Sequence, residues 1–348
     1  MIFLLLFISL KAQTQQTYDR VIDSLYQPGE PGGVALVAQH GRILYQRAFG
    51  MADLELGVTM QPDMLFEIGS MTKQFTAGCI LQLAEQGKLK IDDPLSKHID
   101  SCPPAWQGIK LEHLLTHTSG IIDLSGPVGD LKEILKMYRG HALNFSPGTK
   151  RVYSNIGYAL LGFVIEKVSG ESYPDYLQQH ILKPLGLDHT LYGNTATIIP
   201  GRVPCYLRSK NGKAFHNAVF NLQPSAAGAL LSNAADLWKW NSALTSGQVI
   251  SKSSLQKAWT SYHLADGKNT HYGYGWQTDG IIQGSLVVEH GGVAVGYLTD
   301  ALYLPEEDIF VVVLSNQRGV LPEIPAAKLA AIALWKPDTM RAIPTVEK

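Results

Sequence analysis

The segment that begins with Glu67-Ile68-Gly69-Ser70-Met71-Thr72-Lys73 indicates both a helix and a candidate catalytic group. The apolar residues that follow recur close to helical spacing, at Phe75, Cys79, Ile80 and Leu83. This spacing predicts a helix over residues 70–86, with Gly87 at its C-cap position. Ser70 then lies where the helix begins, and Lys73 lies three residues later on the same face.

This spacing suits a nucleophile and its base. Apolar neighbours would partly desolvate Lys73, and burial favours a neutral amine that can accept a proton from the Ser70 hydroxyl. The helix N-terminus also offers the backbone N–H of Ser70 to a developing oxyanion. A serine cap followed by a surface lysine gives the same S-x-x-K spacing by chance, so the motif alone leaves both interpretations open.

A second polar motif is Tyr153-Ser154-Asn155, which follows the Pro147-Gly148 turn and precedes a helix predicted over residues 158–168. A phenol can relay a proton, and a carboxamide can both donate and accept a hydrogen bond. A half-buried tyrosine beside an asparagine cap would have the same sequence.

A third motif, Glu289-His290-Gly291-Gly292, follows an apolar strand. Its two glycines would let a ligand approach the backbone closely. A glycine-rich hairpin with a solvated histidine is the alternative.

Strand signals lie near both ends of the chain and helix signals lie between them. Residues 34–38 and 43–45 flank a hairpin turn, and further strands are predicted over residues 274–276, 286–288, 302–304 and 309–314. A helix is predicted over residues 236–244, and a closing helix over 326–335 begins after Pro325. Strands from both termini must meet to bury their faces.

The layout predicts an α/β (α+β) fold, in which an antiparallel sheet built from both chain ends is flanked by helices and a mainly helical region is inserted. One domain is expected over residues 18–336. Its sheet region covers about residues 20–69 and 270–336, and its helical region covers about 70–269.

The three motifs in this order resemble the serine β-lactamases of class C, the D-alanyl-D-alanine carboxypeptidases and related esterases, a family similar to the penicillin-binding proteins. The segments 114–120 (Leu-Leu-Thr-His-Thr-Ser-Gly) and 226–232 (Ala-Ala-Gly-Ala-Leu-Leu-Ser) also resemble recurrent segments of that group. The resemblance covers roughly residues 30–335 and implies an α/β sandwich with a helical domain.

The resemblance implies a role for each motif residue. Ser70 would attack a carbonyl and form an acyl-enzyme, while Lys73 and Tyr153 would share the general-base task, with the proton acceptor left open between them. Asn155 would orient the substrate amide or ester. The backbone N–H groups of Ser70 and Val293 would form the oxyanion hole. No cofactor is implied.

The third motif bears on the substrate. By resemblance, His290 stands where many members carry lysine, and members that bind a free carboxylate usually have threonine where this chain has Gly291, beside Gly292. Gly291 offers no hydroxyl, and a histidine is largely neutral at neutral pH. Both changes weaken carboxylate recognition, which favours an esterase or peptidase acting on a small molecule or peptide.

Two other functions are compatible with the same motifs. A class C-like β-lactamase or a D-alanyl-D-alanine carboxypeptidase is the enzymatic alternative. A ligand sensor that has lost turnover is the non-enzymatic one, and the intact Ser70, Lys73, Tyr153 and Asn155 weigh against it. There is no G-x-S-x-G elbow and no glycine-rich nucleotide loop. His113 and His117 have metal-ligand spacing, but no third ligand is evident, so no metal site is predicted.

Bulk properties narrow the partners and the compartment. The net charge is −1 and no basic run is present, which gives no support to nucleic-acid binding. The apolar run over residues 2–10, followed by Lys11-Ala12, resembles a signal peptide of residues 1–12 and is too short to span a bilayer stably. We therefore expect a periplasmic or secreted protein. The oligomeric state is left open.

Overall fold

A six-stranded antiparallel sheet joins the two ends of the chain in the computed structural model, which describes residues 14–124, 130–212, 214–219 and 225–335. In spatial order the strands are β10 (Gln277–Ile282), β11 (Ser285–Val293), β12 (Leu298–Leu304), β13 (Ile309–Ser315), β1 (Gly33–Gln39) and β2 (Arg42–Phe49). β1 pairs with β13, Gly33 lying opposite Ser315 and Gln39 opposite Ile309. The predicted α/β fold class is confirmed.

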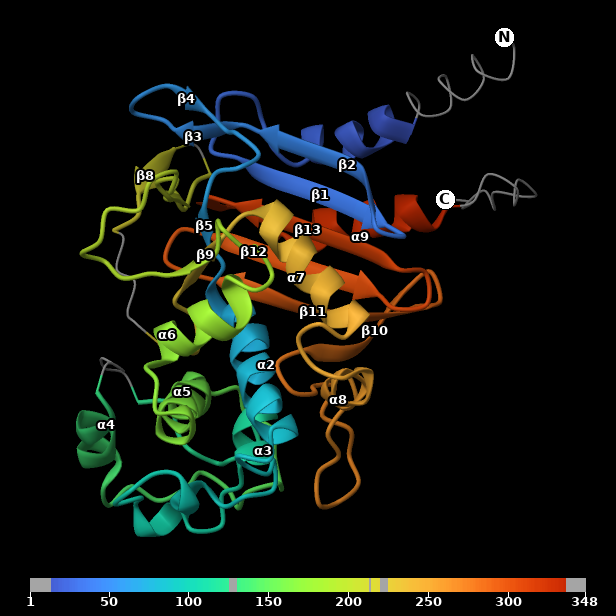
Figure 1. Ribbon diagram of the computed structural model, residues 1–348. Helices are drawn as coiled ribbons and strands as arrows, with labels where there is room; N and C mark the ends of the chain where they lie inside the picture. The colour runs from blue at the N-terminus through green and yellow to red at the C-terminus, as the bar shows by residue number, and fades with distance from the viewer. Residues whose placement is uncertain (1–13, 125–129, 213, 220–224, 336–348) are drawn as a thin grey trace.

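Helices cover both faces of this sheet (Figure 1). As a result, β1 and β13 are buried along almost their whole length. Val34 and Leu36 belong to the larger core, which includes α7 (Ala234–Ser246), whereas Ala35 and Val37 face α9 (Glu323–Leu334) and the helical residues 14–23. Successive side chains point to opposite faces of a strand, so each buried strand contributes to two cores.

The inserted region is mainly helical. It contains α2 (Thr72–Glu85), α3 (Leu111–Leu115), α4 (Leu131–Tyr138), α5 (Asn155–Ser169), α6 (Tyr173–Leu177) and α8 (Lys252–Ala258), with short turns η1 (Gly69–Met71), η2 (Leu95–Lys97), η3 (Pro104–Trp106) and η4 (Gln178–Leu182). Small strands complete the fold: β3 (Met51–Asp53), β4 (Val58–Thr59), β5 (Phe66–Glu67), β6 (Leu191–Tyr192), β7 (Tyr206–Arg208), β8 (Phe215–Asn217), β9 (Leu230–Ser232) and β14 (Gln317–Arg318). β6 to β9 lie within the range expected to be helical.

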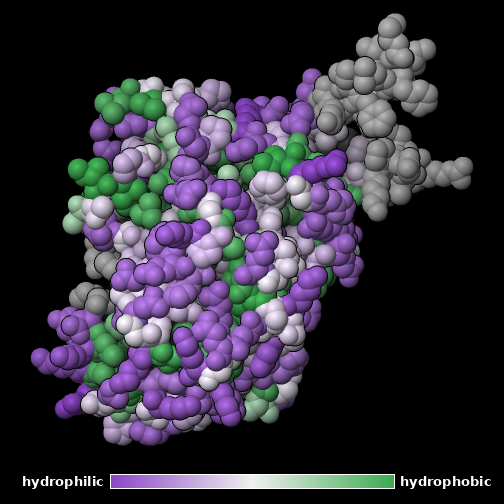
Figure 2. All heavy atoms as spheres, in the orientation of Figure 1, coloured by the Kyte–Doolittle hydropathy of each residue, from purple (hydrophilic) through white to green (hydrophobic). Residues whose placement is uncertain are grey.

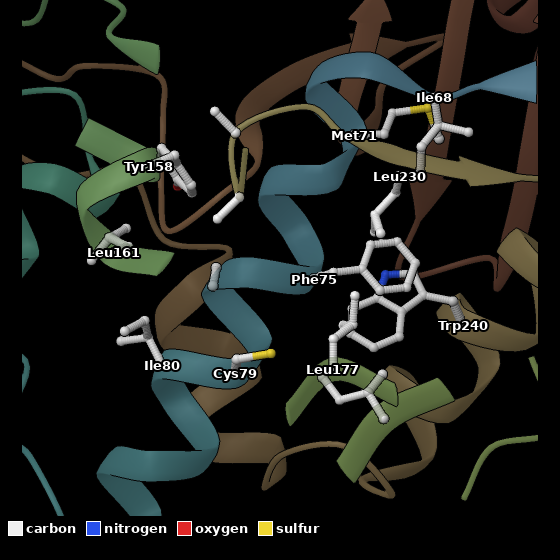
Figure 3. Close-up of a cluster of buried hydrophobic side chains, with 14 of the residues drawn as sticks. Ile68, Met71, Phe75, Cys79, Ile80, Tyr158, Leu161, Leu177, Leu230 and Trp240 are labelled. Carbon is white, nitrogen blue, oxygen red and sulfur yellow. The ribbon is translucent and has the colours of Figure 1, made fainter. Parts of the chain in front are cut away.

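Helix α2 is the centre of the larger core and is enclosed on nearly all sides, as Figure 3 shows. The Phe75 ring stacks on Trp240 of α7 with centroids 4.1 Å apart. Tyr158 and Leu161 of α5 lie on the other side of α2. A helix buried all round has no polar stripe. The one lysine near its start, Lys73, is therefore taken fully out of solvent.

Three local predictions differ from the structure. Residues 274–276 form a bend, where Gly275 has φ +91°, and the strand begins at Gln277. The closing helix begins at Glu323, so Pro325 lies in its first turn, where the missing N–H needs no partner. Ser70 lies in the 3₁₀ turn η1 that leads into α2.

The surface is mainly hydrophilic in the face that Figure 2 shows, with apolar atoms gathered near β4 and β8. Leu56, at 78% exposure, and Val58 contribute to that apolar area. Within the described ranges, no helix combines the length and apolar character needed to cross a bilayer. The predicted signal peptide of residues 1–12 lies outside the described residues.

Candidate active site

Close backbone packing places the turn that carries Ser70 beside the last residue of β11. Gly69 has φ +51°, and a Cβ built on it would lie 2.9 Å from the backbone nitrogen of Val293. Thr299 of β12 also holds this turn against the sheet, because its Oγ1 donates a hydrogen bond to the Ile68 carbonyl at 3.2 Å. Two segments far apart in the chain thus bring the backbone of Val293 next to the nucleophile turn.

The Ser70 hydroxyl has two polar neighbours. Lys73 Nζ lies 3.0 Å from Ser70 Oγ, and the Tyr153 hydroxyl donates to the same oxygen at 2.7 Å. Lys73 Nζ also donates to Asn155 Oδ1 at 2.9 Å and to the Ala227 carbonyl at 2.8 Å. The structure therefore brings together Ser70 of η1 and Lys73 of α2 with Asn155, the first residue of α5, and Tyr153, which lies just before that helix.

Burial determines the protonation of both neighbours. Desolvation lowers the pKa of Lys73 to about 7, opposed by the charge of Asp123. A neutral amine has two hydrogens and one lone pair. The Asn155 and Ala227 oxygens can only accept, so they take both hydrogens and leave the lone pair facing the Ser70 hydroxyl. Desolvation raises the pKa of Tyr153 to about 12, which keeps its phenol protonated at neutral pH.

The segment 226–230 is held along one face of α2. Thr76 Oγ1 donates to the Ala226 carbonyl at 2.6 Å, and the backbone N–H of Leu230 donates to Thr72 Oγ1 at 3.2 Å. These bonds flank the one between Lys73 and Ala227. The resemblance of this segment to a recurrent family segment thus has a physical counterpart, since it carries one of the two acceptors of the lysine.

Asp123 organises the start of α5, a role that the sequence motifs did not predict. Its carboxylate accepts hydrogen bonds from the Ser154 hydroxyl at 2.7 Å, the Asn155 N–H at 2.7 Å and the Ile156 N–H at 3.2 Å. A carboxylate at a helix N-terminus satisfies free N–H groups and interacts favourably with the helix dipole. No local pattern marks Asp123, which acts on residues about 30 positions later.

The His290 ring points into the protein and is only 3% exposed. Nδ1 lies 2.6 Å from the Gly291 carbonyl, and Nε2 lies 2.9 Å from the Tyr272 hydroxyl. A carbonyl only accepts, so Nδ1 carries the proton and Nε2 accepts from Tyr272. Burial first, and then the charge of Lys73, lowers the pKa of His290 to about 3. The imidazole is thus neutral, and both of its nitrogens are used within the protein.

The two glycines after His290 differ in their surroundings. A Cβ on Gly292 would lie 2.0 Å from the Ile68 carbonyl, so a side chain there would push β11 away from the Ser70 turn. A Cβ on Gly291 would have ordinary contacts, with Glu323 Oε1 at 3.4 Å and Asp300 Oδ1 at 3.6 Å. The side-chain direction of position 291 is therefore toward two carboxyl groups.

The two histidines with metal-ligand spacing do not share a helix face. His113 lies in α3, whereas His117 lies beyond its end with φ +58°. In the described part of the chain, no three histidine, cysteine or acidic side chains are grouped to hold a metal ion. The cysteines Cys79, Cys102 and Cys205 are unpaired.

Comparison with known proteins matches nearly the whole chain to one protein family. A family described as Beta-lactamase matches residues 17–334. The chain is 28% identical over 337 residues to "Penicillin-binding protein 4*" of Bacillus subtilis, an alignment that covers 88% of this chain and 73% of that protein. The chain spans 64% of the length of other curated relatives that it matches.

Solved structures agree with the sequence comparisons. The octameric penicillin-binding protein homologue from Pyrococcus abyssi superposes with a TM-score of 0.79 at 29% identity, covering 94% of this chain and 76% of that one. A D-stereospecific amidohydrolase from Streptomyces sp. superposes with a TM-score of 0.72 at 26% identity, covering 87% and 94%. The family resemblance inferred from the motifs is confirmed.

Proposed function

Because the chain belongs to the beta-lactamase family, we propose that it is a serine hydrolase that cleaves ester and amide carbonyls through an acyl-enzyme on Ser70. The observation that carries this proposal is the Ser70 hydroxyl, which lies within hydrogen-bonding distance of both Lys73 and Tyr153. A serine hydroxyl is a weak nucleophile unless a neighbouring base takes its proton. Lys73, with a pKa lowered to about 7, is able to do so at neutral pH.

The proton path follows from the two pKa directions. As Ser70 Oγ attacks the carbonyl carbon, its proton passes to the neutral amine of Lys73. The N–H groups of Ser70 and Val293 stabilise the oxyanion. When the tetrahedral intermediate collapses, the Tyr153 hydroxyl gives its proton to the leaving oxygen or nitrogen and receives one from Lys73. Water then attacks the acyl carbon, Lys73 and Tyr153 pass one of its protons to the departing Ser70 Oγ, and the acid product leaves.

The surroundings of position 291 support substrates that have no carboxylate near the reacting carbonyl. His290 is neutral and has no free nitrogen, so it supplies no positive charge to a substrate. Gly291 directs its Cβ position toward Glu323 of α9, on the sheet face opposite to the one that Gly292 turns toward the Ser70 turn, so it offers a substrate carboxylate no partner. Threonine at position 291 would direct its side chain toward Glu323 and Asp300. The similarity to a D-stereospecific amidohydrolase supports amides among the substrates.

Covalent labelling tests the nucleophile. After incubation with a fluorophosphonate, peptide mapping should find the added mass on the Ser70 peptide, and Ser70→Ala should remain unlabelled. Labelling that persists in Ser70→Ala would overturn the assignment. Stoichiometric acylation by esters and amides without turnover would instead support a ligand sensor.

Steady-state kinetics test the substrate class. A short-chain nitrophenyl ester should have a kcat/KM about 10 to 100 times that of a penicillin, the factor expected when a charge-assisted hydrogen bond is missing. A penicillin hydrolysed faster than the ester would contradict this specificity.

We also propose that the enzyme acts outside the cytoplasm, on the strength of the apolar run over residues 2–10. N-terminal sequencing of protein from the native host should give a chain that begins near Gln13. An intact Met1 in cytosolic protein would contradict the proposal.

A further inference from the structure

His117 lies directly behind the tyrosine that contacts the nucleophile. Its ring is 1% exposed and packs on the Tyr153 ring, with centroids 4.3 Å apart and planes at 33°. The rings of Tyr158 and Tyr272 enclose it, at 5.2 Å and 4.7 Å. The mechanism proposed above uses the Tyr153 hydroxyl but assigns nothing to this imidazole.

His117 also bonds both chain neighbours of Tyr153. Its Nδ1 accepts the backbone N–H of Ser154 at 3.1 Å, and its carbonyl accepts the N–H of Val152 at 3.0 Å. One residue thus contacts the tyrosine ring and fixes the backbone on either side of it. Tyr153 itself is 40% exposed, and the described hydrogen bond of its side chain is the one to Ser70.

The bond to Ser154 defines the state of the imidazole. Because Nδ1 accepts, the proton of the neutral ring is on Nε2, which is buried without a hydrogen-bond partner. A second proton on Nδ1 would break the bond to Ser154. Burial, reinforced by the charge of Lys73, lowers the pKa of His117 well below its ordinary value, which keeps the ring in the accepting form.

The backbone at His117 is itself unusual. Its φ of +58° is a left-handed conformation that is uncommon for residues other than glycine, although asparagine, aspartate and histidine adopt it more often than the rest. Such a conformation persists where surrounding contacts enforce it. In this conformation the side chain accepts the N–H of Ser154 and the carbonyl accepts the N–H of Val152.

From these contacts we propose that His117 is a positioning residue, which holds the Tyr153 hydroxyl in line with Ser70. The inference rests on the proposed function, because it concerns the direction of a proton-transfer group. A misplacement of about 1 Å at such a group can lower a rate by about 100-fold. The ring of His117 packs on that of Tyr153, so we expect its effect on the reaction to pass through Tyr153.

The chain offers a matched control in the same segment. His113 is also buried, at 8% exposure, and its Nδ1 likewise accepts a backbone N–H, that of Lys110, at 3.1 Å. Asparagine Oδ1 occupies the position of histidine Nδ1, and asparagine tolerates left-handed φ values. His117→Asn and His113→Asn therefore each keep the acceptor and remove the ring, but only the first ring lies against Tyr153.

The test compares these variants in two backgrounds. His117→Asn should lower kcat for ester hydrolysis and the rate of fluorophosphonate labelling about 10 to 100-fold, with KM little changed, while His113→Asn should change neither by more than about twofold. In the Tyr153→Phe background, His117→Asn should cause no further loss, because the hydroxyl that it positions is absent. Equal losses in both backgrounds would overturn the proposal.

Two further measurements keep the proposal testable whatever the activity. If His117→Asn does not fold, His117→Phe, which keeps a ring and removes the acceptor, takes its place in the same comparison. In crystal structures, the Tyr153 hydroxyl should lie beyond hydrogen-bonding distance of Ser70 Oγ in the His117 variants and within it in His113→Asn. An unmoved hydroxyl would overturn the inference. Absence of labelling in the unmodified enzyme would count against the proposed function alone.

Discussion

At the scale of single residues, the site depends on a lysine that the fold holds out of water. Lys73 is fully buried, yet its amine has three oxygen neighbours, and two of them can only accept. Burial disfavours the charged amine. The carboxylate of Asp123 opposes this effect and keeps the pKa of Lys73 at about 7, close to the pH at which the enzyme is expected to work.

The first prediction concerns pH. Lys73 accepts a proton only when neutral, so the rate of fluorophosphonate labelling should rise with pH and level off above about pH 7. Asp123→Asn removes the charge that raises the pKa of Lys73, so the midpoint should move to lower pH. Labelling rates measured from pH 5 to 9 check both statements. A rate that falls as pH rises through 7 would exclude Lys73 as the base.

The second prediction concerns the coupling of the two neighbours of Ser70. Lys73→Met and Tyr153→Phe should each lower kcat for ester hydrolysis by about 10²–10⁴-fold, the usual worth of general acid–base assistance. Because both serve one proton path, the double variant should lose far less than the product of the single losses. Lys88→Met, beyond the end of α2, is the control. A double loss equal to that product would show that the two act independently.

At the scale of elements, the edge of β11 and the turn η1 form one unit. A Cβ on Gly292 would meet the Ile68 carbonyl at 2.0 Å and Thr299 Oγ1 at 2.3 Å. Both are held in place, the carbonyl by the Ser70 turn and the hydroxyl by β12. The strand can therefore approach the nucleophile closely only where this position has no side chain.

The third prediction compares the two adjacent glycines. Gly292→Ala should displace β11 and move the Val293 N–H away from Ser70, with a loss of labelling rate of about 10²-fold or more, since removal of one oxyanion donor costs that much. Gly291→Ala meets only ordinary contacts and should change the rate far less. Labelling kinetics and the melting temperature of both variants are the measurements. Equal behaviour of the two variants would contradict the close-packing argument.

At the scale of the whole molecule, the two ends of the chain meet in the middle of the main sheet. The pairing of β1 with β13 joins residues near 35 to residues near 313, and all seven residues of β13 are buried. The larger core lies on one side of these strands and the smaller core on the other. A defect in β13 should therefore weaken both layers together.

The fourth prediction follows from this shared sheet. Leu314→Ala should lower the free energy of unfolding by about 2–5 kcal/mol in a single cooperative transition, because a fully buried leucine leaves a cavity. Leu56→Ala, at a position that is 78% exposed, should stay within about 0.5 kcal/mol of the unmodified protein. Urea unfolding followed by fluorescence checks both. Two separate transitions in Leu314→Ala would show that the layers unfold independently.

The sequence by itself determined the order of the motifs, the family and the helix that begins near Ser70. These are local properties: hydrophobic period and turn residues act over a few positions and can be read without knowing what packs against them. The antiparallel sheet from both ends also followed, because strands at the termini have no other partners against which to bury their faces.

The tertiary structure alone decided the state of the charged and polar groups. The full burial of Lys73, the neutral and internally bonded His290, the capping by Asp123 and the place of His117 behind Tyr153 all depend on residues tens to hundreds of positions away. Desolvation and hydrogen-bond direction are properties of a three-dimensional neighbourhood. The sequence could therefore name the nucleophile and its neighbours, whereas only the packed chain set their protonation and aim.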